Sequence, residues 1–235
     1  MTDYTVIDLE MTGLNPKNDR IIEIGAVRVR DGKMTENFER MVNPHRSIPE
    51  KIQEITGITD EDVTDGAEVS AALTDTLEFL GDDILVGHNI IFDYSFLKQE
   101  AVNEKISLEA KAVDTLKLAR KFLPGEQKKT LEALCSYYGI ARVHGHRACF
   151  DAEMTWQLYE KLKTDFFLGN EAEFEPKPLL HKAKRQTPAT KIQKIHLKEL
   201  LDYHTIEADV PWESLTKSEA SRMTDQIISR YGRIQ

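Results

Sequence analysis

The chain has 235 residues, of which 40% are hydrophobic and 30% are charged, a composition typical of globular proteins. It has no apolar run near the length of a membrane span, no recognisable signal peptide and too few cysteines (two) for a disulfide framework. We therefore expect a soluble protein of the reducing cytoplasm, with one large core or two unequal domains.

The net charge of −9 is unevenly distributed. Residues 176–235 hold 11 Lys or Arg and 7 Asp or Glu, a formal charge of +4, so residues 1–175 carry −13. The basic part suits binding to a polyanion such as nucleic acid, and cations bound in the acidic part would reverse its local charge.

The first part of the chain has patterns typical of β-strands. Residues 4–9 form a short apolar segment, residues 21–29 are rich in β-branched side chains, and residues 38–42 follow the hairpin signal Asp31-Gly32. We expect three strands here, paired in antiparallel fashion.

Helix patterns dominate the next part. Pro49 and Gly57 mark the start and end of one predicted helix, and a second helix is predicted to start at Thr59. Further helices are expected at residues 69–80, 92–102, 114–122, 131–138 and 147–163, with one strand at residues 84–87. A hairpin followed by alternating helices and strands predicts an α/β fold with a mixed sheet flanked by helices.

Residues 169–190 contain three prolines, few apolar side chains and a basic cluster, which is typical of a linker. This linker would join a domain over residues 1–168 to a small basic helical module over residues 191–235. A module of that size is marginally stable alone, so we expect it to dock on the main domain or on a partner.

The module has two amphipathic patterns. The first expected helix has Ile192, Ile195 and Leu200 on its apolar face. The second starts at a capping box, Thr216 to Glu219. Its expected apolar positions are Ala220, Met223, Ile227 and Tyr231.

Two carboxylates, Asp8 and Glu10, stand two residues apart in the first predicted strand. Because strand side chains alternate between faces, both point the same way. Like charges aimed at one place repel each other, and a pair of divalent cations, Mg²⁺ or Mn²⁺, is the usual partner for ligands that are all oxygen. The alternative is a solvated strand face, which is the commoner setting for this pattern.

Three later residues carry suitable chemistry. Asp93 follows the strand at 84–87 and begins a helix, where the alternative role is stabilisation by the helix dipole. Asp151 falls on the core-facing stripe of its helix, where a carboxylate is rare unless it binds metal or pairs with a buried arginine. His146, about one turn earlier, has a pKa range that suits a general base, although a lone histidine is more often structural.

A structural zinc site is a competing interpretation. Cys135, His144, His146 and Cys149 are suitable ligand types. Their spacing fits no common zinc module, and Cys135 falls on an apolar helix, so we favour the carboxylate site.

In this order and spacing, the residues resemble the DEDDh 3′–5′ exonuclease family, which includes the proofreading epsilon subunit and the exonuclease domain of the Gram-positive replicative DNA polymerase. The matching segments are residues 8–14, 87–97 and 146–151, with supporting matches at 22–26, 55–58 and 131–134. The resemblance covers about residues 3–165. It implies an RNase H-like fold, in agreement with the α/β pattern.

The resemblance also implies a mechanism. Asp8, Glu10, Asp93 and Asp151 would hold two Mg²⁺ or Mn²⁺ ions, and His146 would take a proton from the attacking water. Nucleoside 5′-monophosphates would be released from the 3′ ends of single-stranded or frayed DNA.

A terminal base that leaves the duplex needs a surface on which to stack. Our candidate nucleotide contacts are Met11, Thr12, Gly13, Leu14, Ile58, His88, Asn89 and Phe92. The N–H of Thr12 is expected near the 3′-hydroxyl, and core packing is the alternative for Leu14, Ile58 and Phe92. Glu23 either approaches the site from the second strand or is a neutral or exposed strand residue.

Two other functions remain open. One is an exoribonuclease that acts on short RNA or tRNA 3′ ends. The other is an interaction protein that serves a DNA polymerase or another replication protein, with the basic module recruiting DNA or protein. The exonuclease of the leading interpretation would act in proofreading or repair. We expect no membrane partner.

Overall fold

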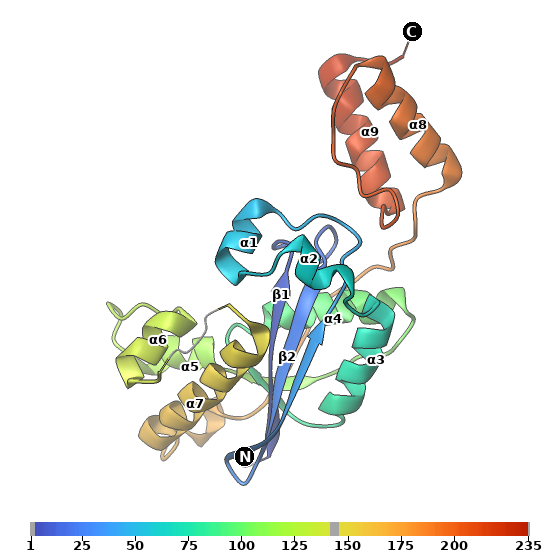
Figure 1. Ribbon diagram of the computed structural model, residues 1–235. Coiled ribbons are helices and arrows are strands. Elements are labelled where there is room, and N and C mark those ends of the chain that lie inside the picture. The colour runs from blue at the N-terminus through green and yellow to red at the C-terminus, as the bar shows by residue number, and fades with distance from the viewer. Residues whose placement is uncertain (1–2, 142–145, 235) are drawn as a thin grey trace.

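A six-stranded mixed sheet lies at the centre of the computed structural model, which describes residues 3–141 and 146–234 (Figure 1). The strands are β1 Tyr4–Met11, β2 Ile21–Arg30, β3 Lys33–Met41, β4 Leu85–Gly87, β5 Lys111–Asp114 and β6 Lys177–Pro178. They are ordered β3-β2-β1-β4-β5-β6. The first three are antiparallel, whereas β1, β4 and β5 run parallel, so the expected mixed sheet is confirmed.

Helices flank the sheet, and two more follow it. They are α1 Glu50–Thr56, α2 Asp60–Thr64, α3 Val69–Leu80, α4 Ile91–Asn103, α5 Thr115–Phe122, α6 Leu131–Tyr138, α7 Ala148–Phe166, α8 Lys191–Tyr203 and α9 Lys217–Tyr231. Local signals set several ends. Pro49 precedes α1, and Gly57 ends it with a left-handed φ of 70°. Among the described residues, none of the helices combines the length and hydropathy needed to cross a membrane.

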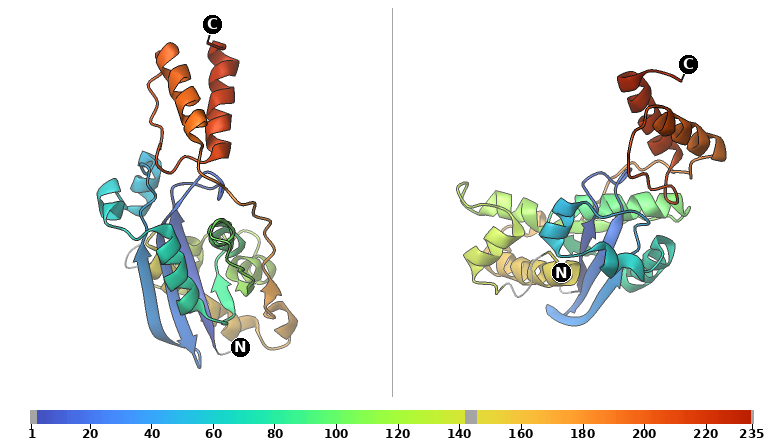
Figure 2. Two further views of the ribbon diagram at one scale, coloured as in Figure 1. Left: turned by 90° about the vertical axis from the view of Figure 1, so that its right-hand side faces the viewer. Right: turned by 45° about the horizontal axis from the view of Figure 1, so that its top comes forward.

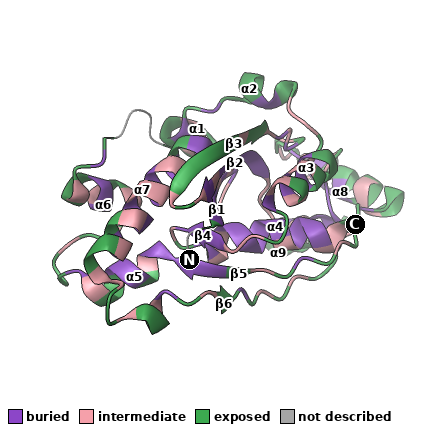
Figure 3. Cartoon of the chain, turned by 90° about the horizontal axis from the view of Figure 1, so that it is seen from below, coloured by how far each residue is buried: buried purple, intermediate pink, exposed green. Residues whose placement is uncertain are grey.

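The two faces of the sheet bury separate apolar clusters. Helix α7 packs across β1 and β2 with α5 and α6 beside it, and α3 and α4 cover the opposite face (Figure 1). Because side chains of β1 alternate, Val6 belongs to the α7 cluster and Ile7 to the other. Figure 3 shows β3 as an exposed edge strand and β1, β4 and β5 as largely buried. This alternation orients the site described below.

Two strands depart from the sequence pattern. Strand β5 is not predicted, because Ala112 and Val113 are too few apolar residues to show a period, and pairing with β4 makes the strand. Strand β3 begins at Lys33 rather than at residue 38, since exposed polar residues can pair with β2 along a sheet edge. In both cases the tertiary partner overrides weak local preference.

The predicted linker is partly built into the main domain. A short 3₁₀ helix, Glu171–Glu173, is followed by β6, which pairs with β5. Phe174 packs in the α7 cluster, and Leu179 packs in the cluster on the opposite face. The boundary expected at residue 168 is therefore too early, because these apolar side chains complete both cores of the sheet domain.

The last two helices form a module with its own apolar core (Figure 2). Leu197, Leu200 and Leu201 form the buried face of α8, whereas Ile192 is 79% exposed and Ile195 is 57% exposed, so their predicted core positions are wrong. On α9, the residues predicted as apolar contacts are buried or partly buried except at its end, where Tyr231 is 47% exposed. The module docks beside the carboxyl end of β1 (Figures 1 and 2).

Candidate active site

Asp8 and Glu10 lie on the face of β1 that meets α7. They share the face of Val6, which packs in the α7 cluster. Strand β1 pairs with β4 at Thr5 and Val6 and with β2 along its length, so pairing with β2 holds the backbone that carries the two carboxylates. This agrees with the orientation expected from the spacing of the two acids.

Asp93 reaches the same place from α4. Its Oδ1 accepts a hydrogen bond of 3.0 Å from the N–H of Leu9, the residue between Asp8 and Glu10. The Asp93 side chain is buried, in the first turn of α4, which closely follows β4. The hydrogen bond therefore ties the start of that helix to the centre of the carboxylate pair.

Asp151 and His146 come from the start of α7. Asp151 lies in the first turn on the buried stripe that the sequence predicts, together with Ala148 and Thr155. One ligand atom each from Glu10, His146 and Asp151 lies within 4.8 Å of the other two. The backbone of His146 is in the left-handed region at φ 59°, so the chain turns sharply just before the helix.

A glycine allows this turn of α7 to lie against the sheet. A Cβ added at Gly25 of β2 would lie 2.1 Å from the carbonyl carbon of Ala148 and 2.1 Å from the backbone nitrogen of Cys149. Backbone atoms cannot yield as a flexible side chain can, so any larger residue would displace the helix start. The positions of His146 and Asp151 depend on that close approach.

Glu23 lies fully buried next to the same turn. Its Oε1 accepts hydrogen bonds from Nε and Nη2 of Arg147 at 2.9 and 2.7 Å, and its Oε2 accepts one from the N–H of Ala148 at 2.8 Å. Of the roles left open by the sequence, an exposed strand residue is therefore wrong. The pairing joins residues 124 positions apart, so local pattern could not reveal it.

Burial is the main cause of raised pKa values at three of these carboxylates, Asp8, Glu10 and Asp93. Burial, reinforced by the charges of Asp93, Glu10 and Asp151, raises the pKa of Asp8 well above its ordinary range. Burial and then the charge of Asp151 raise the pKa of Glu10 to about 8, and burial raises the pKa of Asp93 to about 7. A cluster that resists ionisation in this way, built of oxygen donors beside an imidazole, suits divalent cations such as Mg²⁺ and Mn²⁺.

The predicted nucleotide contacts have different settings. Leu14 is 80% exposed and Phe92 is partly buried, so both present surface to a ligand. Met11 and Thr12 are buried at the end of β1, and Ile58 packs in a separate apolar cluster beside α1 and α2. These residues remain predicted contacts, with Leu14 the most accessible.

His88 and Asn89 are engaged within the chain. The Nδ1 of His88 is 2.9 Å from Oγ1 of Thr115, and its Nε2 is 2.8 Å from the carbonyl oxygen of Lys129. The N–H of Asn89 donates to Oδ1 of Asp114 at 3.0 Å. Burial lowers the pKa of His88, which favours its neutral form in this network.

The end of β1 continues into a tight loop. The N–H of Thr12 donates to the carbonyl oxygen of Arg20 at 2.8 Å. It is therefore already engaged, contrary to the expectation that it would contact a 3′-hydroxyl. A Cβ added at Gly13 would lie 2.5 Å from the carboxylate carbon of Asp19. A larger residue would push this carboxylate aside, and the carboxylate accepts a hydrogen bond from the N–H of Asn15 at 2.8 Å.

The competing zinc set gains little from the structure. Among the described residues, Cys135 and Cys149 are buried and form no disulfide, and burial raises the pKa of the Cys149 thiol to about 11. Zinc binds the thiolate, which that environment disfavours. His144 lies outside the described residues.

Comparison with known proteins shows that the chain is similar to exonucleases. The family model described as Exonuclease matches residues 5–159. The chain is 33% identical over 233 residues to a DNA polymerase III PolC-type of Clostridium perfringens. The aligned region covers 92% of this chain and 16% of that protein. It is 39% identical over 164 residues to the DNA polymerase III PolC-type of Bacillus subtilis, covering 69% of this chain and 11% of that protein. The chain thus spans about a sixth or less of the length of these relatives.

Solved structures share the fold. Exonuclease X in complex with 5′ overhanging duplex DNA is 26% identical, with a TM-score of 0.58 over 73% of this chain and 97% of that one. The nuclease domain of 3′hExo, a DEDDh family member bound to rAMP, is 17% identical with a TM-score of 0.63, over 76% of this chain and 98% of that one. The second likeness supports the fold alone, and the expected RNase H-like fold is confirmed. The chain therefore belongs to the exonuclease family, and its four clustered acids and its histidine are of the residue types that name the DEDDh group.

Proposed function

We propose that this protein is a metal-dependent 3′–5′ exonuclease that releases nucleoside 5′-monophosphates from single-stranded or frayed DNA. The observation that carries the proposal is the meeting of acids from β1, α4 and α7 with His146 at one end of the sheet. The identity to PolC-type DNA polymerases favours DNA as the substrate, as well as a role in replication or repair.

Each group has a proposed role. Asp8, Glu10, Asp93 and Asp151 would hold two divalent cations, Mg²⁺ or Mn²⁺. When bound, these ions supply charge stabilisation at the reacting phosphate. The imidazole of His146 would accept a proton from the attacking water, since histidine is the side chain that most often acts as a general base.

The substrate end would be held beside β1. Leu14 offers exposed apolar surface in the loop that follows the carboxylates, and Phe92 lies one residue before Asp93. A base separated from its duplex loses stacking, and contact with such side chains offsets that loss. We therefore propose that single-stranded and frayed ends are cut faster than paired ends.

The first test is a digest of 5′-labelled single-stranded DNA with Mg²⁺, with Mn²⁺ and with EDTA. The proposal expects products that shorten from the 3′ end only when metal is present, and no products from Asp8→Ala. An RNA of the same sequence tests the alternative exoribonuclease, which would be favoured by faster cleavage of the RNA. If neither strand is cut, the enzyme proposal fails and a polymerase-associated interaction protein becomes the leading function.

The base assignment has a separate test. His146→Ala should lower kcat by about 10²–10⁴, the usual contribution of a general base. His196→Ala, at an exposed position on α8, provides the matched control and should keep the rate. Full activity of His146→Ala at neutral pH would show that another group accepts the proton.

A further inference from the structure

The loop over residues 12–20 begins directly after the strand that carries Asp8 and Glu10. It is closed at its base by a reciprocal pair, in which the N–H of Thr12 donates to the carbonyl of Arg20 and the N–H of Arg20 donates to Oγ1 of Thr12 at 2.9 Å. The loop contains Leu14, a proposed nucleotide contact whose side chain is 80% exposed. Its conformation therefore bears on how a 3′ end would be seated.

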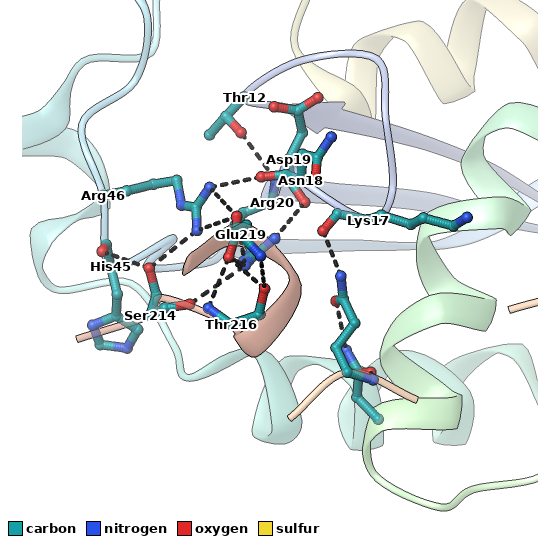
Figure 4. A network of polar contacts seen from close by, with 12 residues as sticks. Thr12, Lys17, Asn18, Asp19, Arg20, His45, Arg46, Ser214, Thr216 and Glu219 are labelled. Carbon is teal, nitrogen blue, oxygen red and sulfur yellow. Dashed lines mark hydrogen bonds and ion pairs between the residues drawn. The ribbon is translucent and has the colours of Figure 1, made fainter. Parts of the chain in front are cut away.

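Side chains from outside the loop, and Arg20 at its base, hold its backbone carbonyls (Figure 4). Nη1 of Arg20 donates to the carbonyl of Asp19 at 3.1 Å, and Nη1 of Arg46 donates to the carbonyl of Asn18 at 2.6 Å. Nε2 of Gln186, on the segment that leads into the C-terminal module, donates to the carbonyl of Lys17. The loop is thus held by groups that also contact or lead into the module.

Both arginines converge on one buried carboxylate of the module (Figure 4). Glu219 is 4% exposed; its Oε1 lies 3.1 Å from Nη2 of Arg46, and its Oε2 lies 3.4 Å from Nη2 of Arg20. Hydrogen bonds from Thr216 and the two guanidinium charges hold the pKa of Glu219 below its ordinary value despite its burial. The carboxylate is therefore ionised at neutral pH, and two arginines that would otherwise repel each other share it.

The contact is reinforced beside this triad. Nη2 of Arg46 also donates to Oγ of Ser214 at 3.2 Å, and that hydroxyl donates to the carbonyl of His45 at 3.1 Å. The module thus contacts both the loop after β1 and the segment that contains Arg46. A single carboxylate stands at the centre of these contacts.

We propose that the C-terminal module is a positioning element for the substrate end, and that Glu219, through Arg20 and Arg46, sets the conformation of the 12–20 loop. The inference rests on the proposed exonuclease function for the role of Leu14. Glu219 is a positioning residue, because it acts on the substrate through the loop. Its loss should weaken binding of the 3′ end and leave the chemical step unaltered.

The variant Glu219→Gln separates this role from helix capping. The Oε2 of Glu219 also accepts hydrogen bonds from the N–H and hydroxyl of Thr216 at 2.9 and 2.8 Å. Glutamine can still cap a helix in this way, whereas it loses the charge shared by the two arginines. Glu213→Gln is the matched control, because Glu213 lies at an exposed position between α8 and α9 and its substitution also removes one negative charge.

Kinetics on a short single-stranded oligonucleotide provide the first readout, with the full-length chain in each case. We expect Glu219→Gln to raise KM by roughly threefold to thirtyfold and to leave kcat within about twofold, and Glu213→Gln to change neither. An unchanged or lower KM, or a loss confined to kcat, would overturn the positioning role. If the wild type cuts no nucleic acid, the proposed function fails instead, and the two failures are thereby distinguished.

Hydrogen exchange provides a readout that needs no activity. In Glu219→Gln, the amides of Thr12 and Asp19 should exchange faster than in the wild type, while the amides in the centre of β1 should keep their protection. Equal exchange in the loop of both proteins would show that the loop is held without the module, and the proposal would then be wrong.

Discussion

The guanidinium of Arg147 donates two hydrogen bonds to a single oxygen of the buried Glu23 carboxylate, at 2.9 Å from Nε and 2.7 Å from Nη2. The other oxygen of Glu23 accepts the N–H of Ala148, the first residue of α7. One carboxylate thus fixes both the side chain that precedes α7 and the backbone with which α7 begins. His146 and Asp151 lie on either side of this anchored turn.

Glu23→Gln should therefore slow catalysis without touching a proposed ligand. Glutamine has one accepting oxygen where Glu23 uses two, so either the Arg147 contact or the Ala148 contact is lost. We expect kcat to fall by roughly 10–100-fold, since small displacements of catalytic groups have effects of this size. Steady-state kinetics at saturating Mg²⁺ measure it.

Glu39→Gln is the control for that variant. Glu39 also pairs with Nη2 of Arg147, at 2.9 Å, but its side chain is 49% exposed and it does not bind the start of α7. An exposed ion pair contributes little, so we expect kcat within about threefold of the wild type. Equal losses in the two variants would mean that the charge of Arg147, and not the position of α7, matters.

Metal-free protein should lose stability as the pH rises. The pKa of Glu10 is raised from an ordinary 4.5 to about 8 and that of Asp93 from 3.8 to about 7, so the folded state binds more protons than the unfolded chain across this window. The free energy of unfolding must therefore fall as the pH rises from about 4 to 8. Thermal unfolding in EDTA at pH 5, 6, 7 and 8 measures the slope.

Added Mg²⁺ should counter that loss and stabilise the protein more at pH 8 than at pH 6. Metal binds the ionised carboxylates, and at lower pH it must first displace protons. The variant Glu10→Gln should show a shallower decrease in EDTA. A midpoint that does not depend on pH in EDTA would argue against the raised pKa values.

The close approach at Gly25 predicts a large effect from one methyl group. Gly25→Ala would place Cβ 2.1 Å from backbone atoms of α7, whereas Gly125→Ala meets no atom within 4 Å. We expect a loss of roughly 1–3 kcal/mol or more in the free energy of unfolding for the first variant and little change for the second. Urea denaturation compares them, and similar stabilities would show that α7 can move away from β2 without cost.

The domain boundary can be tested with two neighbouring leucines. Leu179 is 6% exposed in the core of the sheet domain, whereas Leu180 is 82% exposed. Leu179→Ala should cost roughly 2–5 kcal/mol of stability, and Leu180→Ala less than about 0.5 kcal/mol. A small effect in both variants would restore residue 168 as the end of the main domain.

Local signals in the sequence were sufficient for most of the secondary structure. Helix α3 has its predicted bounds because apolar residues recur at helical spacing, and α6 ends at Gly139, which takes a left-handed φ of 66°. Where a segment depends on its partner, the pattern fails. Strand β5 and the edge strand β6 form because neighbouring strands supply their hydrogen bonds.

The candidate site divides in the same way. Alternation along β1 determined that Asp8 and Glu10 face one side, and helical spacing determined that Asp151 faces the core, because both are properties of the local backbone. The order of motifs determined the family. None of these signals determines the distance between two helices or strands.

Only the tertiary structure decided how those elements meet. The Asp93 hydrogen bond to Leu9, the Glu23 pairing with Arg147 and the Glu219 contact with Arg46 join residues that are far apart in the chain. Each needs two separately formed elements to pack at one distance and angle. Packing and the burial of charge impose that geometry, and a linear pattern does not carry it.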